Sequence, residues 1–541
     1  MWKWRNLEVM LLLSALLPAG ALSVTAEDLS LSKQRTDCFA TDEVERPSSQ
    51  HVFGTHNFLI HYDTEGQKAV YNSDIDADPS DGVPDYINRM AEYFEKSWAT
   101  YIEELGYDPP PPDNGLGGDD RYDIYVTRIT GRTEREFPSI YYPNREAYAS
   151  YIFIGNDMRN EHHPNDPYPF LKVTCAHEFY HAVQLAYRGN PMDETSWWYE
   201  LTAVWAEDLV FDEVNEHYYY LSDYFPKIHN SIYLSGPPHS YGAWVFAEYL
   251  SERYGKSIIR EVFEKLKTDN NESIFAINDV LSDYMLEFNI EFSLFSGWNY
   301  FTAENYKDGF YEEGEAFPIS VPISDSHYYY PVNWINNQIE LENLGISYIY
   351  FGSPDIPKGD LVISFQSSEN YPEGVCLAGI YDDRPISLKA YKLDANETYE
   401  FRVTEFDHCY GAVLAINWSY QGFSEIENTA GYKYSAYIDS LIDGIAEGEP
   451  PVPGEFTIIG NHPNPFNLAT EITFYWNSNP SYYNISIYDI TGRQVEAFGG
   501  SADTGINQVK WKANDDLTSG VYFYRLSVDD NSLGGRMLLL K

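Results

Sequence analysis

The stretch His177-Glu178-Phe179-Tyr180-His181 is the most informative part of the chain, and it lies within the apolar-rich segment Leu171–Tyr187. That segment contains neither glycine nor proline, so it is predicted to be helical. Residues four positions apart share one face of a helix, so the imidazoles of His177 and His181 can bind a single cation. Glu178 would then lie beside a metal-bound water and could accept its proton. The alternative is an ordinary helix that carries two histidines.

A second predicted helix, containing residues 196–207, supplies a carboxylate further along the chain. Glu200 follows His181 with 18 residues between them. Polar residues at 193–196 can cap this helix, and Arg188-Gly189-Asn190-Pro191 is a turn signal before it. Two helices joined in this way can bring a carboxylate onto the metal face of the first. Two imidazoles, one carboxylate and a water make the open coordination of a catalytic zinc site.

This pattern resembles the gluzincin metalloproteases, in which a liganding Glu lies about that far downstream of the HExxH pentad. The resemblance implies that His177, His181 and Glu200 are zinc ligands and that Glu178 is the general base. Glu207, two helical turns after Glu200 on the same face, is the rival third ligand. Glu200 is favoured because its spacing fits the family.

Other segments are similar to a family of secreted bacterial proteins that are classed as metalloproteases largely from their sequence pattern. The similarity covers roughly residues 50 to 310 and includes His56–Tyr62, Gly82–Tyr86 and Tyr122–Val126. It implies a reaction class and a protein or peptide substrate, but no particular substrate. The chain lacks the Gly-x-Met-Glu-Asn string with which aminopeptidase gluzincins hold a free amine. An endopeptidase is therefore favoured.

Composition limits the partners and the domain count. The chain has 541 residues, too many for one domain, and a formal net charge of −48. Such a charge argues against nucleic acid as a partner, because phosphate binding needs clustered Lys and Arg. It also disfavours an anionic membrane surface and suits a soluble extracellular protein.

The N-terminus has the features of an export signal. Lys3 and Arg5 precede the apolar core Val9–Leu17, which is too short to span a bilayer. Val24-Thr25-Ala26 is the preferred cleavage site and Ala19-Gly20-Ala21 the second choice. We therefore expect a signal peptide over residues 1–26 and a polar leader or tether over 27–45. No other segment is long and apolar enough to predict a transmembrane helix.

The remaining chain is predicted to be multidomain. Residues 46–312 mix strands with helices, as in an α+β, zincin-like metalloprotease domain. Short β runs separated by turns predict a β-sandwich over 318–440, which could bind substrate or act as a spacer. Residues 441–455, with Glu449-Pro450-Pro451, form an extended linker. Residues 456–541 are predicted to be a small, immunoglobulin-like all-β module.

That last module resembles the C-terminal sorting domain of the bacterial type IX secretion system. Several segments carry the resemblance in order: Asn461–Asn467, Ile485–Arg493, Ser519–Leu526 and Met537–Lys541. The resemblance implies an interaction with the type IX machinery and a secreted or surface-attached protein. An ordinary immunoglobulin-like accessory domain is the alternative.

An acidic loop offers a second candidate metal site. Alternating carboxylates on a loop can converge on one hard cation such as calcium, and Gly82 permits a sharp turn. The pattern departs from the EF-hand, because Pro79 lies inside it and no Glu occupies the twelfth position. A solvated acidic turn that caps the helix beginning near Pro84 is the alternative. The candidate calcium ligands are Asp74, Asp76, Asp78, Asp81 and Asp85.

Two further features concern catalysis. Gluzincins place a His or Tyr where it can donate a hydrogen bond to the developing oxyanion, and the resemblance suggests Tyr241 first and His239 second. Ala149–Gly155 is predicted to be a strand. In zincins an edge strand just upstream of the metal helix pairs with extended substrate. An interior strand of the same sheet is the alternative.

Four cysteines are expected in an oxidising compartment: Cys38, Cys175, Cys376 and Cys409. Cys376 and Cys409 both fall in the strand-rich region, so they are the expected disulfide. A disulfide between Cys38 and Cys175 is a second possibility. The alternative is that Cys175 is simply a small, buried apolar residue.

Together these features predict a secreted zinc-dependent endopeptidase with Glu178 as its general base and calcium as a second candidate cofactor. The alternative function is a catalytically silent, zinc-containing adhesin or a surface protein that binds glycan or protein. An intact Glu178 favours the enzyme, because a purely structural metal site has no need of a base.

Overall fold

The computed structural model describes most of the chain from Arg46 onward. The described ranges are 46–189, 193–234, 238–267, 273–337, 340–353, 359–381, 384–420, 429–439, 456–462, 466–476, 478–489, 493–514, 517–529 and 531–539. The predicted signal peptide, the leader, Cys38 and the 441–455 linker lie outside these residues.

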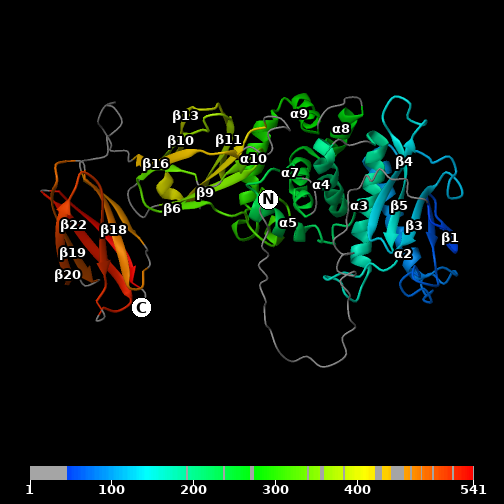
Figure 1. The fold of residues 1–541 in the computed structure, drawn as a ribbon, viewed down its shortest axis with the longest axis horizontal. Coiled ribbons are helices and arrows are strands. Elements are labelled where there is room, and N and C mark those ends of the chain that lie inside the picture. Colours follow the sequence, from blue (N-terminus) through cyan, green and yellow to red (C-terminus); the bar gives the residue numbers. More distant parts are fainter. Residues whose placement is uncertain are drawn as a thin grey trace, which may run out of the picture.

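A five-stranded sheet forms one end of the N-terminal part (Figure 1). Its central strands are parallel to one another, and both edge strands are antiparallel to their neighbours. The central β3 and β5 are buried almost throughout, as parallel strands covered on both faces usually are. In spatial order the strands are β1 (His51–Gly54), β2 (Phe58–Tyr62), β3 (Tyr122–Thr127), β5 (Tyr148–Gly155) and β4 (Gly131–Pro138).

Helix α3 (Tyr168–Tyr187) contains the pentad and packs between this sheet and helix α4 (Asp193–Val210). Every residue of α3 from Val173 to Tyr187 is buried. A helix that is apolar on all sides belongs inside a core, so neighbouring elements cover α3 on all sides and not on one face only. Both predicted helices of the metal region are therefore present.

The other helices complete the N-terminal part. Residues 243–266 repeat at helical spacing, and the structure divides them into two helices at Gly255. Gly255 has φ +90°, a left-handed conformation that glycine adopts without a steric penalty. The helices are α2 (Asp85–Trp98) with the π-helix η1 (Ala99–Glu104), α5 (Tyr218–Tyr224), η2 (Phe225–Lys227), α6 (His239–Gly242), α7 (Trp244–Tyr254), α8 (Ser257–Leu266), α9 (Ser273–Asp283), α10 (Phe288–Tyr300), η3 (Ala303–Asn305) and η4 (Gly314–Ala316).

Two facing sheets follow, as the short β runs predict. One has the order β13-β10-β16-β7 and the other the order β12-β11-β14-β9-β6, with a two-stranded β15-β8 ribbon beside them. Their buried faces share a core. The elements are β6 (Asp325–His327), β7 (Val332–Asn336), β8 (Leu341–Glu342), β9 (Ile346–Gly352), β10 (Asp360–Gln366), β11 (Glu373–Tyr381), β12 (Ser387–Leu393), β13 (Thr398–Val403), η5 (Phe406–His408), β14 (Cys409–Trp418), β15 (Thr429–Ala430) and β16 (Lys433–Asp439).

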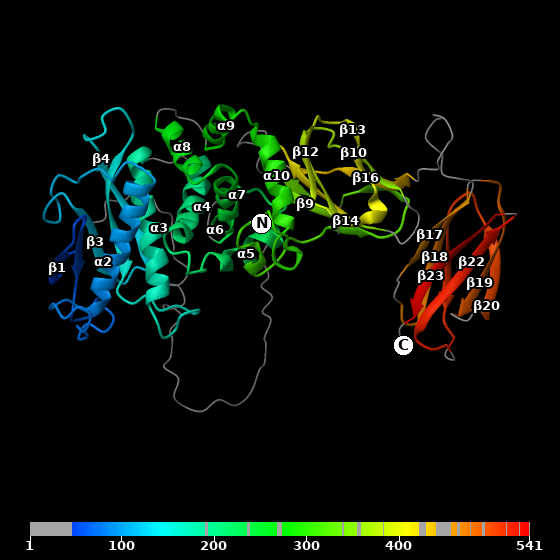
Figure 2. The ribbon, with the colours of Figure 1, turned by 180° about the vertical axis from the view of Figure 1, so that it is seen from behind.

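Helix α10 joins this sandwich to the helical part, and Figure 2 shows it between the two. Asn417 Nδ2 on β14 donates to Ser293 Oγ at 3.1 Å, and the Tyr348 hydroxyl on β9 donates to the Ser296 carbonyl at 2.9 Å. The main core of the N-terminal part continues across α10 into β9, β11 and β14. The predicted boundary near residue 318 therefore divides the chain but not this core.

The C-terminal module is a second two-sheet unit with its own core. Its sheets have the orders β17-β18-β21 and β20-β19-β22-β23. The molecule thus combines a mixed α/β N-terminal part with an all-β C-terminal region. The strands are β17 (Phe456–His462), β18 (Ala469–Trp476), β19 (Ser481–Asp489), β20 (Gln494–Ala502), β21 (Gly505–Lys512), β22 (Gly520–Val528) and β23 (Asn531–Leu539).

The expected disulfide between Cys376 and Cys409 is wrong. Both residues lie on adjacent strands, but Cys376 pairs with Ala415, whereas Cys409 pairs with Tyr381. Five residues of offset along a strand separate their Cα atoms by roughly 17 Å, far beyond the roughly 7 Å that a disulfide can bridge. Both thiols are free, as is that of the fully buried Cys175.

Candidate functional site

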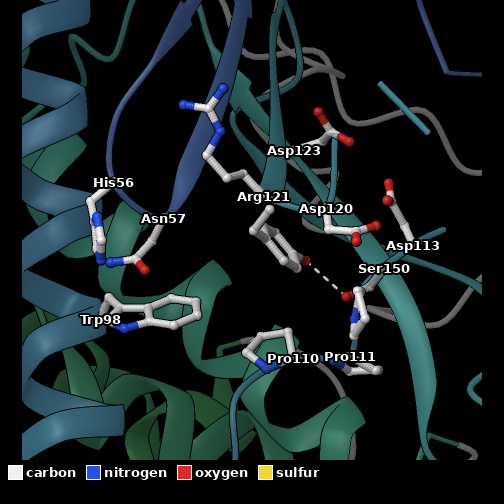
Figure 3. A pocket seen from close by; sticks show the side chains of 12 residues that line it. His56, Asn57, Trp98, Pro110, Pro111, Asp113, Asp120, Arg121, Asp123 and Ser150 are labelled. Atoms are coloured by element: carbon white, nitrogen blue, oxygen red, sulfur yellow. Dashed lines mark hydrogen bonds between the residues drawn. The ribbon is translucent and has the colours of Figure 1, made fainter. Parts of the chain in front are cut away.

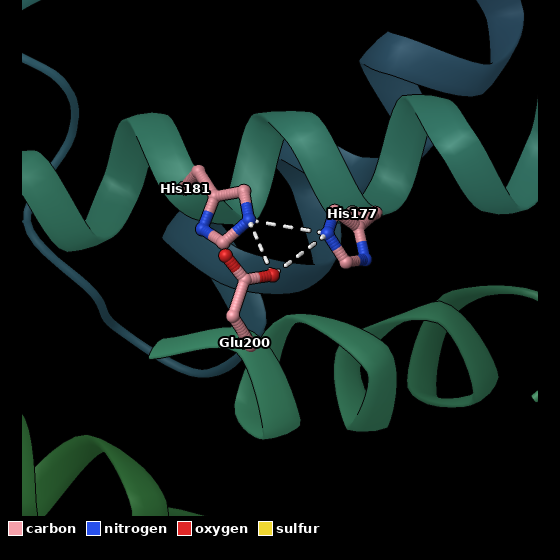
Figure 4. A group of neighbouring side chains, drawn as sticks. All are labelled: His177, His181 and Glu200. Carbon is pink, nitrogen blue, oxygen red and sulfur yellow. Dashed lines mark hydrogen bonds and ion pairs between the residues drawn. The ribbon is translucent and has the colours of Figure 1, made fainter. Parts of the chain in front are cut away.

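Helices α3 and α4 bring His177, His181 and Glu200 together (Figure 4). The two Nε2 atoms lie 3.1 Å apart. Glu200 Oε2 is 3.8 Å from His177 Nε2 and 3.6 Å from His181 Nε2. The two imidazoles are buried, and the Glu200 side chain is 15% exposed. The three side chains can therefore offer one ligand atom each to a single cation.

Glu207, the rival third ligand, contacts the opposite side of His177. Its Oε1 lies 2.7 Å from His177 Nδ1. A carboxylate in this position accepts the Nδ1 proton and leaves Nε2 with a lone pair directed at Glu200 and His181. Glu207 is thus placed to orient a histidine rather than to join the cluster, and its own side chain is buried.

Gln184 orients His181 in the same way. Its Nε2 donates to the Tyr199 carbonyl at 2.9 Å and to Thr202 Oγ1 at 3.0 Å, so its Oε1 is the end that faces His181. That oxygen lies 2.7 Å from His181 Nδ1 and accepts its proton. His181 Nε2 therefore faces His177 Nε2. Gln184 lies three residues after His181 on the same helix, so this helical spacing is the signal that could have predicted the contact.

Glu178 is held by the edge strand β4. The Thr133 hydroxyl lies 2.8 Å from the Glu178 carbonyl oxygen and 2.9 Å from Glu178 Oε2, and both oxygens accept from it. Gly131 also approaches this carboxylate, because a Cβ at that position would be 2.6 Å from Glu178 Oε1 and 2.7 Å from Thr174 Cγ2. The glycine therefore permits a close approach of β4 to the carboxylate. Neither Thr133 nor Gly131 carries a sequence signal that predicts this contact.

The two candidate oxyanion donors differ in their surroundings. The Tyr241 ring on α6 packs edge-on against His177 with 5.7 Å between ring centroids. His239 Nε2 lies 3.1 Å from the Ser231 carbonyl and donates to it. Burial lowers the pKa of His239 to about 4, so the ring is neutral at physiological pH and its Nδ1 is an acceptor. Of the two candidates, Tyr241 is therefore the one that lies beside the histidine cluster.

Strand β5, which contains Ala149–Gly155, is an interior strand. It lies between β3 and β4 in the sheet, so it is not the edge strand that could pair with substrate but the interior strand given as the alternative. Strand β4 is the edge strand of this sheet on the side of the pentad, and it contacts α3 directly. Of the two edge strands, β1 and β4, it is β4 that packs beside the pentad helix.

The acidic loop does not gather its carboxylates. Within the described ranges, two groups of three or more potential ligands have their atoms within 4.8 Å of one another, and neither includes Asp74, Asp76, Asp78, Asp81 or Asp85. Asp76 accepts from the Asp81 and Gly82 amides, and Asp85 accepts from the Ala77 and Asp78 amides. These hydrogen bonds agree with the alternative of an acidic turn before α2, and the calcium site stays a prediction.

A pocket of about 130 Å³ opens elsewhere on the N-terminal part (Figure 3). Trp98, the prolines at 110–112 and several polar residues line it. Within this lining, the hydroxyls of Tyr122 and Ser150 form a hydrogen bond of 2.8 Å. None of His177, Glu178, His181 or Glu200 lines it. It is therefore separate from the cluster on α3 and α4.

Two protein families match parts of the chain. Residues 23–289, just under half of the sequence, match a family described as a family of unknown function (DUF6055). Residues 462–539 match the secretion system C-terminal sorting domain. The chain therefore carries a type IX sorting domain and is a secreted or cell-surface protein. A search of curated proteins finds no match, and no helix of the described residues is long and apolar enough to cross a membrane.

Solved structures align with limited parts of the chain. A glycosyl hydrolase family 2 member from Bacteroides cellulosilyticus is 10% identical, with 36% of this chain and 28% of that chain covered and a TM-score of 0.15. The β-glucuronidase of Bifidobacterium dentium is 12% identical, with coverages of 36% and 38% and a TM-score of 0.15. Dimeric latent PorU from Porphyromonas gingivalis is 10% identical, with coverages of 42% and 35% and a TM-score of 0.16. The chain thus spans well under half the length of these proteins, and similarities this low carry no argument about fold or function.

Proposed function

We propose that this protein is a secreted zinc-dependent endopeptidase in which Glu178 is the general base. The observation that carries the proposal is the convergence of His177 Nε2, His181 Nε2 and Glu200 Oε2. Both Nδ1 atoms donate, one to Glu207 and the other to Gln184, so both rings turn Nε2 toward the same point. A divalent cation at that point can take one ligand atom from each of the three side chains.

The distances between these atoms support zinc. With Zn–N and Zn–O bonds of about 2.0–2.2 Å, the edges of a tetrahedron are about 3.3–3.6 Å long. The three observed separations are 3.1, 3.6 and 3.8 Å. Small side-chain rotations therefore suffice to place all three ligands on one ion. Two imidazoles and one carboxylate leave the fourth position for water, as in catalytic zinc sites.

The surrounding residues suit peptide hydrolysis. A zinc ion bound there would supply Lewis acidity for a water and for the scissile carbonyl. Glu178 takes the proton of the attacking water and later delivers it to the leaving amine. Thr133 keeps one carboxylate oxygen in place during both transfers. Tyr241, beside His177, donates a hydrogen bond to the oxyanion that develops on the carbonyl.

Strand β4 supports an endopeptidase over an aminopeptidase. It is an edge strand that also holds Glu178, so a peptide paired along it would pass the general base in an extended conformation. Such pairing uses the backbone in the middle of a substrate and needs no free amine.

The test uses the full-length secreted protein and a mixture of peptides, with and without a chelator. Chelation should abolish cleavage, and added zinc should restore it. Glu200→Ala should lose zinc and activity together, because a ligand both holds the metal and sets the acidity of its water. Glu178→Gln should keep zinc while turnover falls about a hundredfold or more, because its amide cannot accept the proton.

Glu161→Gln is the matched control, because Glu161 is 88% exposed in a loop and the change removes the same charge. It should leave both zinc and turnover unchanged. Wild-type protein that holds zinc but cleaves no peptide would instead support the alternative, a catalytically silent adhesin or binding protein. Full activity in Glu178→Gln would overturn the mechanism.

A further inference from the structure

A second cluster of potential metal ligands lies where α4 ends. It consists of Asp208 on α4, His217 directly before α5, and Glu313 directly before η4. One ligand atom from each lies within 4.8 Å of the other two. His217 Nε2 is 3.6 Å from Asp208 Oδ1. Asp208 and His217 lie close together in the sequence, whereas Glu313 comes from a distant segment, and the three belong to no recognised motif.

His217 is buried in a way that requires a partner. Its exposed fraction is 0%, and neither ring nitrogen forms a hydrogen bond within the described part of the chain. Trp244 and Tyr218 enclose it edge-on, with ring centroids 4.5 and 4.6 Å away. A buried imidazole that faces a carboxylate and lacks a hydrogen bond can act as a ligand of a cation.

The carboxylates around His217 also require positive charge. Asp208 Oδ1 is buried and has no hydrogen bond, although Asp208 belongs to a group of acidic side chains that includes Glu248 and Glu313. Lys256 is a nearby cation that offsets part of this negative charge. The hydroxyl of Tyr218 donates to Glu313 Oε2, and this hydrogen bond orients the carboxylate as partners of metal ligands do.

We propose that Asp208, His217 and Glu313 bind a second divalent metal ion, of the zinc class. One imidazole with two carboxylates suits zinc and its first-row neighbours, whereas calcium is bound by oxygen ligands alone. The ion connects the end of α4, the start of α5 and the segment before η4. Because α4 also carries Glu200 and Glu207, this second ion holds in place the helix that completes the proposed catalytic cluster.

The first experiment counts zinc in the full-length secreted protein by mass spectrometry. The wild type should hold two equivalents, and His177→Ala/His181→Ala should hold one, because that variant removes only the ligands on α3. In the double variant, added zinc should still raise the melting temperature. One equivalent in the wild type with none in the double variant would overturn the second site and leave the proposed function standing.

The second experiment removes the site itself with isosteric changes. Asp208→Asn and Glu313→Gln should each lose one equivalent of zinc in the wild-type background and abolish the rise in melting temperature in the double-variant background. Glu312→Gln, the exposed neighbour with the same charge change, should keep both. Unchanged zinc content in both Asp208→Asn and Glu313→Gln would refute the assignment. Stabilisation of the double variant by calcium but not by zinc would refute the role of the imidazole.

Discussion

At the residue scale, the position of Glu178 depends on a contact from another element. Thr133 donates a hydrogen bond to one carboxylate oxygen of Glu178. The other oxygen occupies space that is available only because Gly131 has no side chain. A general base must lie within hydrogen-bonding distance of the proton it takes, so small displacements are costly. This dependence gives a first prediction.

Gly131→Ala should reduce turnover about tenfold to a hundredfold without loss of zinc. The new methyl group would lie 2.6 Å from Glu178 Oε1 and must push the carboxylate away from its position. Steady-state kinetics with zinc analysis check this. Gly431→Ala is the control, because a Cβ there meets no atom within 4 Å. Equal kinetics for the two alanine variants would show that β4 does not position the base.

Glu207 is expected to set the affinity of the metal rather than the chemistry. Glu207→Gln replaces the carboxylate that accepts from His177 Nδ1 with a weaker amide, so zinc should bind about ten- to a hundredfold more weakly. At saturating zinc, most of the activity should return. Competition with a chelating dye measures the affinity. A variant that cannot be reloaded at any zinc concentration would instead make Glu207 a ligand and displace Glu200.

At the scale of elements, α10 is packed against the sandwich with no spare volume. Gly297 lies in the middle of this helix, and a Cβ there would be 2.6 Å from Cys376 Sγ on β11 and 3.1 Å from Leu388 Cδ1 on β12. Alanine is favoured over glycine in helices by up to about 1 kcal/mol. Overpacking of a filled core costs typically about 1–3 kcal/mol, so the clash should win.

Gly297→Ala should therefore lower the free energy of unfolding by about 1 kcal/mol, as measured by urea denaturation. The matched test is the double variant Gly297→Ala/Cys376→Ala, in which the clashing sulfur is absent. In the Cys376→Ala background the same glycine change should be neutral or stabilising, because helix propensity then acts without opposition. The same loss of stability in both backgrounds would place the strain elsewhere.

At the scale of the whole molecule, the main hydrophobic core extends across the domain boundary near residue 318 that the sequence pattern predicts. Side chains from the sandwich belong to the same buried cluster as the pentad helix and the helices around it. The sandwich thus covers an apolar surface that the N-terminal part would otherwise expose to water. The contributing sandwich residues are Leu344, Ile346, Tyr348, Cys376, Ala378, Ile380, Val413 and Ala415.

Truncation after residue 317 should consequently give an aggregating protein that binds zinc poorly. Truncation after residue 439 removes the linker and the sorting domain, which has its own core, and should leave zinc content and peptidase activity intact. Size-exclusion chromatography and zinc analysis distinguish the two. A soluble, zinc-loaded product from the shorter chain would show that the sandwich is only an accessory to the N-terminal part.

Much of the local structure is predictable from the sequence. The helix over Leu171–Tyr187 and the short strands of the sandwich follow from composition and periodicity, because these depend on residues close together in the chain. The sorting domain follows from several segments in order. The predicted Cys376–Cys409 disulfide was wrong, since the register of the two strands is decided by packing. The division of residues 243–266 at the left-handed Gly255 was not predicted either.

The same division applies within the candidate site. The placement of His177 and His181 on one face is determined by the sequence, because it needs only the four-residue repeat of a helix. The spacing of 18 residues suggests Glu200 over Glu207, but only the packing of α4 on α3 puts one carboxylate at Nε2 and the other at Nδ1. Thr133 and the Asp208, His217 and Glu313 cluster likewise emerge only in three dimensions. Their contacts join elements up to about a hundred residues apart, and such proximity is set by the shape of the buried core rather than by any local pattern.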